Sequence, residues 1–160
     1  MMLFARKRFD LQPTEPVRVV LATSGGAISP KAIQTTIDQA HGLPVAVLAI
    51  LRVHGSQFGL PNPGLLPTRK ERDDMYEVLD GAISALESAG VEVDGQIAIT
   101  RAIAKRIVNV VVKRAASVLV MDDSPSTGMR RKVEGDVTGS VKRRLSPSVK
   151  FFLVGSPTEA

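Results

Sequence analysis

The chain has 160 residues and a mass of 17.1 kDa, the size of one ordinary domain with a single core. Hydrophobic residues make up 44% of it, charged residues 23% and aromatic residues only 4%, which is typical of a globular protein packed with aliphatic side chains. Cysteine is absent, which excludes disulfides, thiolate metal ligands and a cysteine nucleophile. The histidines are His41 and His54 alone, so no metal is expected at a site of three histidines.

Charge is the first pointer to a partner. The 21 lysines and arginines exceed the 16 acidic residues by five, and the excess is clustered. Such clusters can attract an anion, but they are more often solvated helix faces, the interpretation favoured here. Nucleic acid is not expected as a partner, because no aromatic residues alternate with the basic ones and no DNA-binding pattern is present. The clusters lie at 6–8, 105–106, 113–114, 130–132 and 142–144.

Hydropathy argues against a membrane protein. The longest apolar run, Val45 to Leu51, is far shorter than the roughly 20 residues of a spanning helix. At the start of the sequence, charge follows a very short apolar stretch, the reverse of a secretory signal. We therefore expect a cytoplasmic protein.

The first predicted unit is a strand, a tight turn and a helix. Residues 1–16 are interpreted as an N-terminal arm, and the β-branched run 17–22 as a buried strand. Thr23 to Gly26 is the predicted turn. Ser29, followed by proline, is a good N-cap for a helix that stops at Gly42.

The same unit recurs. Residues 45–53 predict a second buried strand, and Thr68 begins a capping box that opens a helix closed by Gly90. Residues 91–100 predict the third strand. The apolar stripe of the helix consists of Met75, Leu79, Ala82, Ile83 and Leu86.

Two further helices and strands complete the pattern. The helix from Arg101 is expected to bury Ile103, Ile107, Val110 and Val111, and to expose Lys105, Arg106, Lys113 and Arg114. Residues 117–121 predict the fourth strand and 151–154 the fifth, with a helix between them marked by Val137, Val141 and Leu145. Residues 17–155 thus form one domain, followed by a tail at 156–160.

Alternating strands and helices predict an α/β fold: a single five-stranded, mostly parallel sheet in an open, flavodoxin- or Rossmann-like sandwich. The flavodoxin-like order 2-1-3-4-5 and its relatives reverse direction beside the first strand, where ligands bind. A pocket is therefore expected between the turn at Thr23 and the loop after the fourth strand. The segment Gly55 to Pro67 is either a lid over this pocket or an ordinary surface loop.

The strand order, the serine-containing turn and the run from Val118 through Gly128 to Val137 resemble the universal stress protein family. The resemblance covers about Val17 to Val154. It implies an adenine nucleotide alpha hydrolase-like fold and a role in stress tolerance. It also implies dimerisation through the last strand and, in many members, binding of adenosine triphosphate at the switch point.

The nucleotide motif of the family is degenerate in this sequence. Its three glycines and the serine or threonine that follows fall on Asp122, Pro125, Gly135 and Asp136. A rival register would end the motif at Gly139, but it leaves too few residues for the last helix. Pro125 offers no amide, and Asp136 at a helix start can cap the amides that a phosphate would use. Binding of ATP in the usual mode is therefore not expected.

Other positions leave nucleotide binding open. The family's adenine-recognising aspartate is replaced by Thr23, while His54 could stack on a base or be a polar rim residue. Arg130 and its basic neighbours could bind phosphate, and a magnesium ion on the aspartates could bridge to it. The candidate cofactor-binding residues are Thr23, Ser24, His54, Gly128, Arg130, Gly135, Asp136 and Val137.

The sequence is compatible with three functions. The first is a regulatory binding module in the stress response, a homodimer through the edge strand Val149 to Val154, without cofactor. The second is a sensor that binds ATP or another anion at the switch point. An enzyme is the weakest hypothesis, because no nucleophile–base pair or phosphate loop is present, although a slow ATPase stays open if nucleotide binds.

Overall fold

The computed structural model describes residues 15–23, 27–52, 68–123 and 137–155. Within them lie five strands: β1 (Val19–Thr23), β2 (Val45–Arg52), β3 (Val93–Thr100), β4 (Val118–Asp123) and β5 (Lys150–Gly155). The helices are α2 (Pro30–Ala40), α3 (Arg69–Ser88), α4 (Ile103–Lys113) and α6 (Val137–Arg144). The α/β class and the alternation of strand and helix are confirmed.

The strands form one sheet in the order β3-β2-β1-β4-β5, with every pairing parallel. This is the Rossmann-type relative of the flavodoxin-like order, since β1 has β4 rather than β3 as its second neighbour. The direction of winding reverses between β1 and β4, so the predicted switch point beside the first strand is confirmed.

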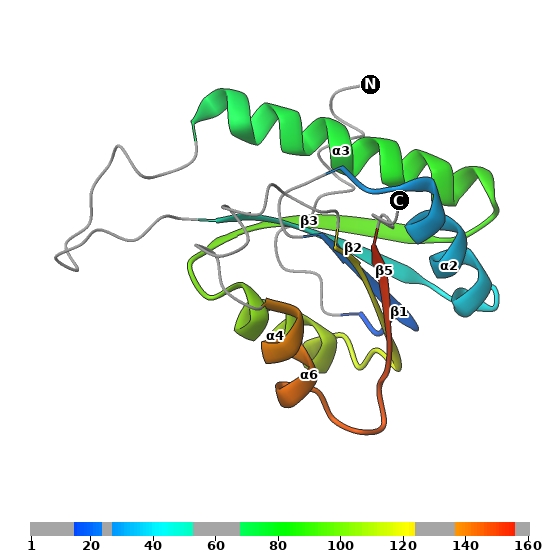
Figure 1. The fold of residues 1–160 in the computed structure, drawn as a ribbon. Helices are drawn as coiled ribbons and strands as arrows, with labels where there is room; N and C mark the ends of the chain where they lie inside the picture. Colours follow the sequence, from blue (N-terminus) through cyan, green and yellow to red (C-terminus); the bar gives the residue numbers. More distant parts are fainter. Residues whose placement is uncertain (1–14, 24–26, 53–67, 124–136, 156–160) are drawn as a thin grey trace, which may run out of the picture.

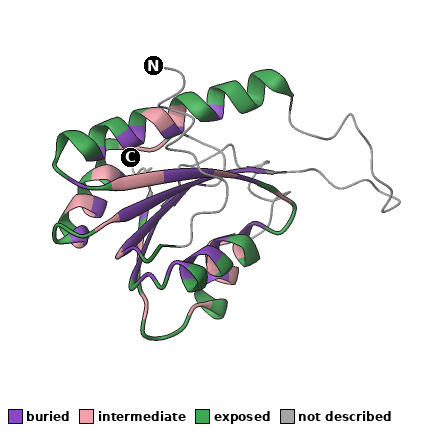
Figure 2. Ribbon diagram, turned by 180° about the vertical axis from the view of Figure 1, so that it is seen from behind, coloured by how far each residue is buried: buried purple, intermediate pink, exposed green. Residues whose placement is uncertain are grey.

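Helices cover both faces of the sheet. Figure 1 shows α2 and α3 on one face and α4 and α6 on the other. Each layer has its own apolar cluster, and the buried strand residues run through the middle of the molecule between them (Figure 2). The predicted stripe of α3 is buried throughout, as are Ile103, Ile107, Val110 and Val111 of α4.

Local signals fix the helix starts as the sequence predicts. The Ser29 hydroxyl at the N-cap of α2 accepts a hydrogen bond from the amide of Ala32. At α3, the Thr68 hydroxyl accepts from the Glu71 amide while the Glu71 carboxylate accepts from the Thr68 amide, a complete capping box. The αL residues His41 and Gly42 end α2.

Arg114 corrects one prediction, because it points into the protein rather than outward. Its side chain is 2% exposed and forms two hydrogen bonds to the Asp94 carboxylate on β3, at 3.0 and 2.6 Å. Its Nε also donates to the carbonyl oxygen of Glu15, at 2.6 Å. The backbone carbonyl of Arg114 accepts from the amide of Val17, so this residue ties the chain before β1 to α4 and β3.

Candidate functional site

The switch point brings two polar residues side by side. In the register of the sheet Thr23, at the end of β1, pairs with Asp122 of β4. Their exposed fractions are only 1% and 2%. A parallel sheet places ligands outside this carboxyl edge where the winding reverses, so Thr23 and Asp122 lie at the bottom of the expected site.

Asp122 is committed to an internal contact. Its Oδ2 accepts a hydrogen bond from the backbone amide of Ser29 at 2.6 Å, just before α2 begins. A helix start is a place where free amides attract anions. Here Pro30 has no amide hydrogen, and Ala32 already donates to the Ser29 hydroxyl. The Asp122 carboxylate and the Ser29 hydroxyl thus already accept hydrogen bonds from two of the amides at this helix start that an anion could otherwise use.

Few of the predicted cofactor-binding residues can be placed. Thr23 is at the switch point, and Val137 begins α6, where it packs half-buried against the cluster beneath α4. The others lie outside the described residues, as does the segment Gly55 to Pro67: Ser24, His54, Gly128, Arg130, Gly135 and Asp136.

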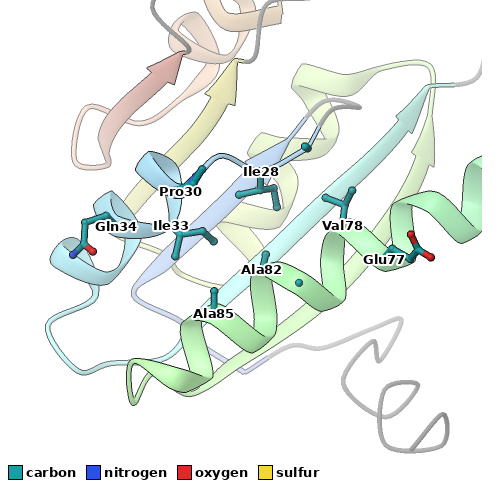
Figure 3. A pocket seen from close by; sticks show the side chains of 10 residues that line it. Ile28, Pro30, Ile33, Gln34, Glu77, Val78, Ala82 and Ala85 are labelled. Atoms are coloured by element: carbon teal, nitrogen blue, oxygen red, sulfur yellow. The ribbon is translucent and has the colours of Figure 1, made fainter.

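Sequence reasoning did not predict the groove between two of the helices. A groove of about 490 Å³ lies between α2 and α3 (Figure 3). Its walls are mostly apolar, with Ile33 on α2, Val78 on α3 and the Ile28 side chain between them in the view of Figure 3. The spacing of small residues on α3 was visible in the sequence. The position of α2 opposite them was not, because it depends on the crossover of the chain.

Two further observations concern the part of the chain that the structure describes. No three histidine, aspartate or glutamate side chains come together there as metal ligands. No helix in these segments has the length and apolar character needed to cross a bilayer.

The geometry defines a class: a doubly wound, parallel α/β domain with its switch point between β1 and β4. Comparisons place this fold among the universal stress proteins. The structure of the universal stress protein from Archaeoglobus fulgidus matches with a TM-score of 0.61 at 16% identity, covering 86% of this chain and 94% of that one. A structure from this family from Burkholderia pseudomallei matches with a TM-score of 0.60 at 16% identity, covering 86% and 96%.

Some structures with the same fold hold nucleotides. The A. fulgidus protein in complex with dAMP has a TM-score of 0.58 at 16% identity, covering 88% of this chain and 97% of that one. A family protein from Arabidopsis thaliana with AMP bound has a TM-score of 0.52 at 12% identity, covering 88% and 94%. No protein-family model and no curated protein sequence matches the chain. The fold implied by the sequence resemblance is thus confirmed.

Proposed function

We propose that this chain is a cytoplasmic, non-catalytic binding module with a regulatory role in the stress response. We further propose that it does not bind ATP in the usual mode of nucleotide-binding universal stress proteins. The shared fold supports the general class of protein. The carboxylate of Asp122 at the switch point carries the second part.

The argument is electrostatic and steric. Asp122 stands where the family motif has its first glycine, so a side chain fills space that a ligand would enter. It is almost fully buried, where the repulsion between like charges is stronger than in water. A phosphate entering here would be repelled by the Asp122 carboxylate. It would also find the Ser29 amide already donating its hydrogen bond to that carboxylate. The site therefore resembles one that carries its own anion.

Isothermal titration calorimetry with ATP and magnesium, and with AMP, tests this proposal. We expect no binding to the natural protein at millimolar nucleotide, and no ATP hydrolysis in a parallel assay. Asp122→Gly, which restores the family residue, is the matched variant; any nucleotide affinity it gains identifies the carboxylate as the block. Micromolar binding to the natural protein would refute the proposal.

A nucleotide sensor is the second candidate, favoured by the structures of similar fold in complex with dAMP, cAMP and AMP. In that case the basic residues near 130, together with magnesium, would replace the missing amide donors. The same titration separates the two candidates, because a sensor must respond to nucleotide whereas a nucleotide-independent module does not.

We also propose that the working form is a homodimer through β5. This strand is at the sheet edge, as predicted, so one side of its backbone has no strand partner among the described residues. Leu153 on it is 45% exposed. An apolar edge strand that stays uncovered invites aggregation, and pairing with a second copy would cover it.

A further inference from the structure

The groove between α2 and α3 is large enough for a small organic molecule. Its volume of about 490 Å³ falls within the range of roughly 300–1,000 Å³ found for such sites. On α3 it extends from Glu77 to Ala85, about 12 Å at the rise of an α-helix. The lining residues are Ala27, Ile28, Pro30, Ile33, Gln34, Glu77, Val78, Gly81, Ala82 and Ala85.

Neither backbone conformation nor crowding requires a glycine at position 81 in this groove. Gly42 and Gly90 adopt positive φ, and a Cβ on Gly95 would lie 2.7 Å from the Ile83 side chain. Gly81 is helical, and a Cβ added to it would meet nothing within 4 Å. Glycine within a helix costs roughly 0.5–1 kcal/mol relative to alanine. Gly81 is exposed, and without a side chain it leaves this part of the groove lining open.

The charged group at the rim is the Glu77 carboxylate, which can only accept hydrogen bonds when ionised. Glu77 forms no ion pair in the segments that the structure describes, whereas its neighbour Asp74 pairs with Lys70 at 3.3 Å. Gln34 donates one amide hydrogen to Asp38, and its side chain is uncharged. Figure 3 shows Glu77 and Gln34 on opposite sides of the apolar walls. Such a rim favours a cation and repels an anion.

We propose that this groove binds a small organic cation, an ammonium group carried on a compact apolar body. The apolar part would lie over Gly81 between Ile33 and Val78, with the ammonium beside Glu77. Charge disfavours a second copy of α3 as the occupant, because that helix carries six acidic residues against three basic ones. One end of the groove adjoins the switch point, since Ile28 and Pro30 flank Ser29, whose amide donates to Asp122. The proposed cation position beside Glu77 is on α3, and the proposal does not depend on nucleotide binding.

The test is a titration of the ¹⁵N-labelled full chain, followed by NMR, with phenylbutylamine, phenylbutanol and phenylbutyrate. We expect the amine to shift the resonances of Ile33, Val78, Ala82 and Ala85 with a submillimolar dissociation constant. The alcohol should bind more weakly, and the carboxylate at least ten-fold more weakly. Glu77→Gln should reduce the affinity for the amine about 2- to 5-fold, the range of an exposed ion pair.

Gly81→Leu should abolish binding, because its side chain fills the floor of the groove. Ser84→Leu, on an exposed part of α3 outside the lining, is the matched control and should bind as the natural protein does. If Gly81→Leu fails to fold, Ala85→Leu narrows the same groove. The proposal is overturned if amine and carboxylate bind equally, if none of the probes binds at millimolar concentration, or if binding survives both groove-filling variants. The proposal would also be overturned if a basic amphipathic peptide bound to the groove while phenylbutylamine did not.

Discussion

Arg114 and Asp94 form an ion pair whose two members differ in exposure, 2% for the arginine and 34% for the aspartate. Removal of one partner from such a pair leaves a charge buried and unpaired. The pair joins the end of α4 to the start of β3. Loss of either partner should therefore lower the free energy of unfolding.

We expect Asp94→Ala to lower the free energy of unfolding by about 3 kcal/mol, because the Arg114 charge then has no carboxylate partner. Arg114→Met keeps most of the volume and removes the charge, so it should cost less. Urea denaturation of both variants measures the difference. Equal losses, or a loss below about 1 kcal/mol for Asp94→Ala, would show that solvent around Asp94 already screens the pair.

The burial of Arg114 is a point at which the prediction from sequence was wrong. Its position continues the buried stripe of α4 by the spacing Ile107, Val111, Arg114, so the helical period indicated the inward face. The prediction followed its charge and its neighbour Lys113 instead. Only the fold brings Asp94, twenty residues away, to the place where that charge can be buried.

At the scale of the element, α3 and β3 contain glycines that should respond to alanine with opposite sign. Gly81→Ala should raise the free energy of unfolding by about 0.5–1 kcal/mol, because the methyl group enters open space on a helix. Gly95→Ala should lower it by about 1–3 kcal/mol, since its Cβ would crowd Leu79 and Ile83. Thermal or urea unfolding of the two variants, side by side, gives the signs. Destabilisation by Gly81→Ala would mean that this glycine has a structural role.

The helices and strands could be predicted from the sequence more completely than the candidate site. The capping box at Thr68 and the apolar stripes of α3 and α4 are local patterns, and they fixed the type and the buried face of each helix. The partners across the sheet and the α2–α3 groove depend on the order of strands, which local patterns do not contain. Asp122 was recognised as a departure from the motif, but its bond to Ser29 joins residues 93 positions apart and required the fold.

The outer edge of β5 is the surface through which the whole molecule is proposed to pair with a second copy. Phe152 is half-buried against the α2–α3 layer, so charging it would disturb the monomer as well as an interface. Leu153 is more exposed and is the sharper probe. We expect Leu153→Glu to convert a dimer into a folded monomer, measured by sedimentation velocity with circular dichroism as the check on folding. A variant that sediments as the natural protein does would count against pairing through β5.

The contact between Arg114 and the Glu15 carbonyl has a practical consequence for shortening the chain. A truncated protein that starts at Glu15 keeps this acceptor and the amide of Val17 that bonds back to Arg114. One that starts at Val19 loses both and leaves a guanidinium hydrogen without its acceptor in the interior. Truncation to Val19 should therefore lower the free energy of unfolding more than truncation to Glu15 does, as urea denaturation of the two shortened proteins would measure.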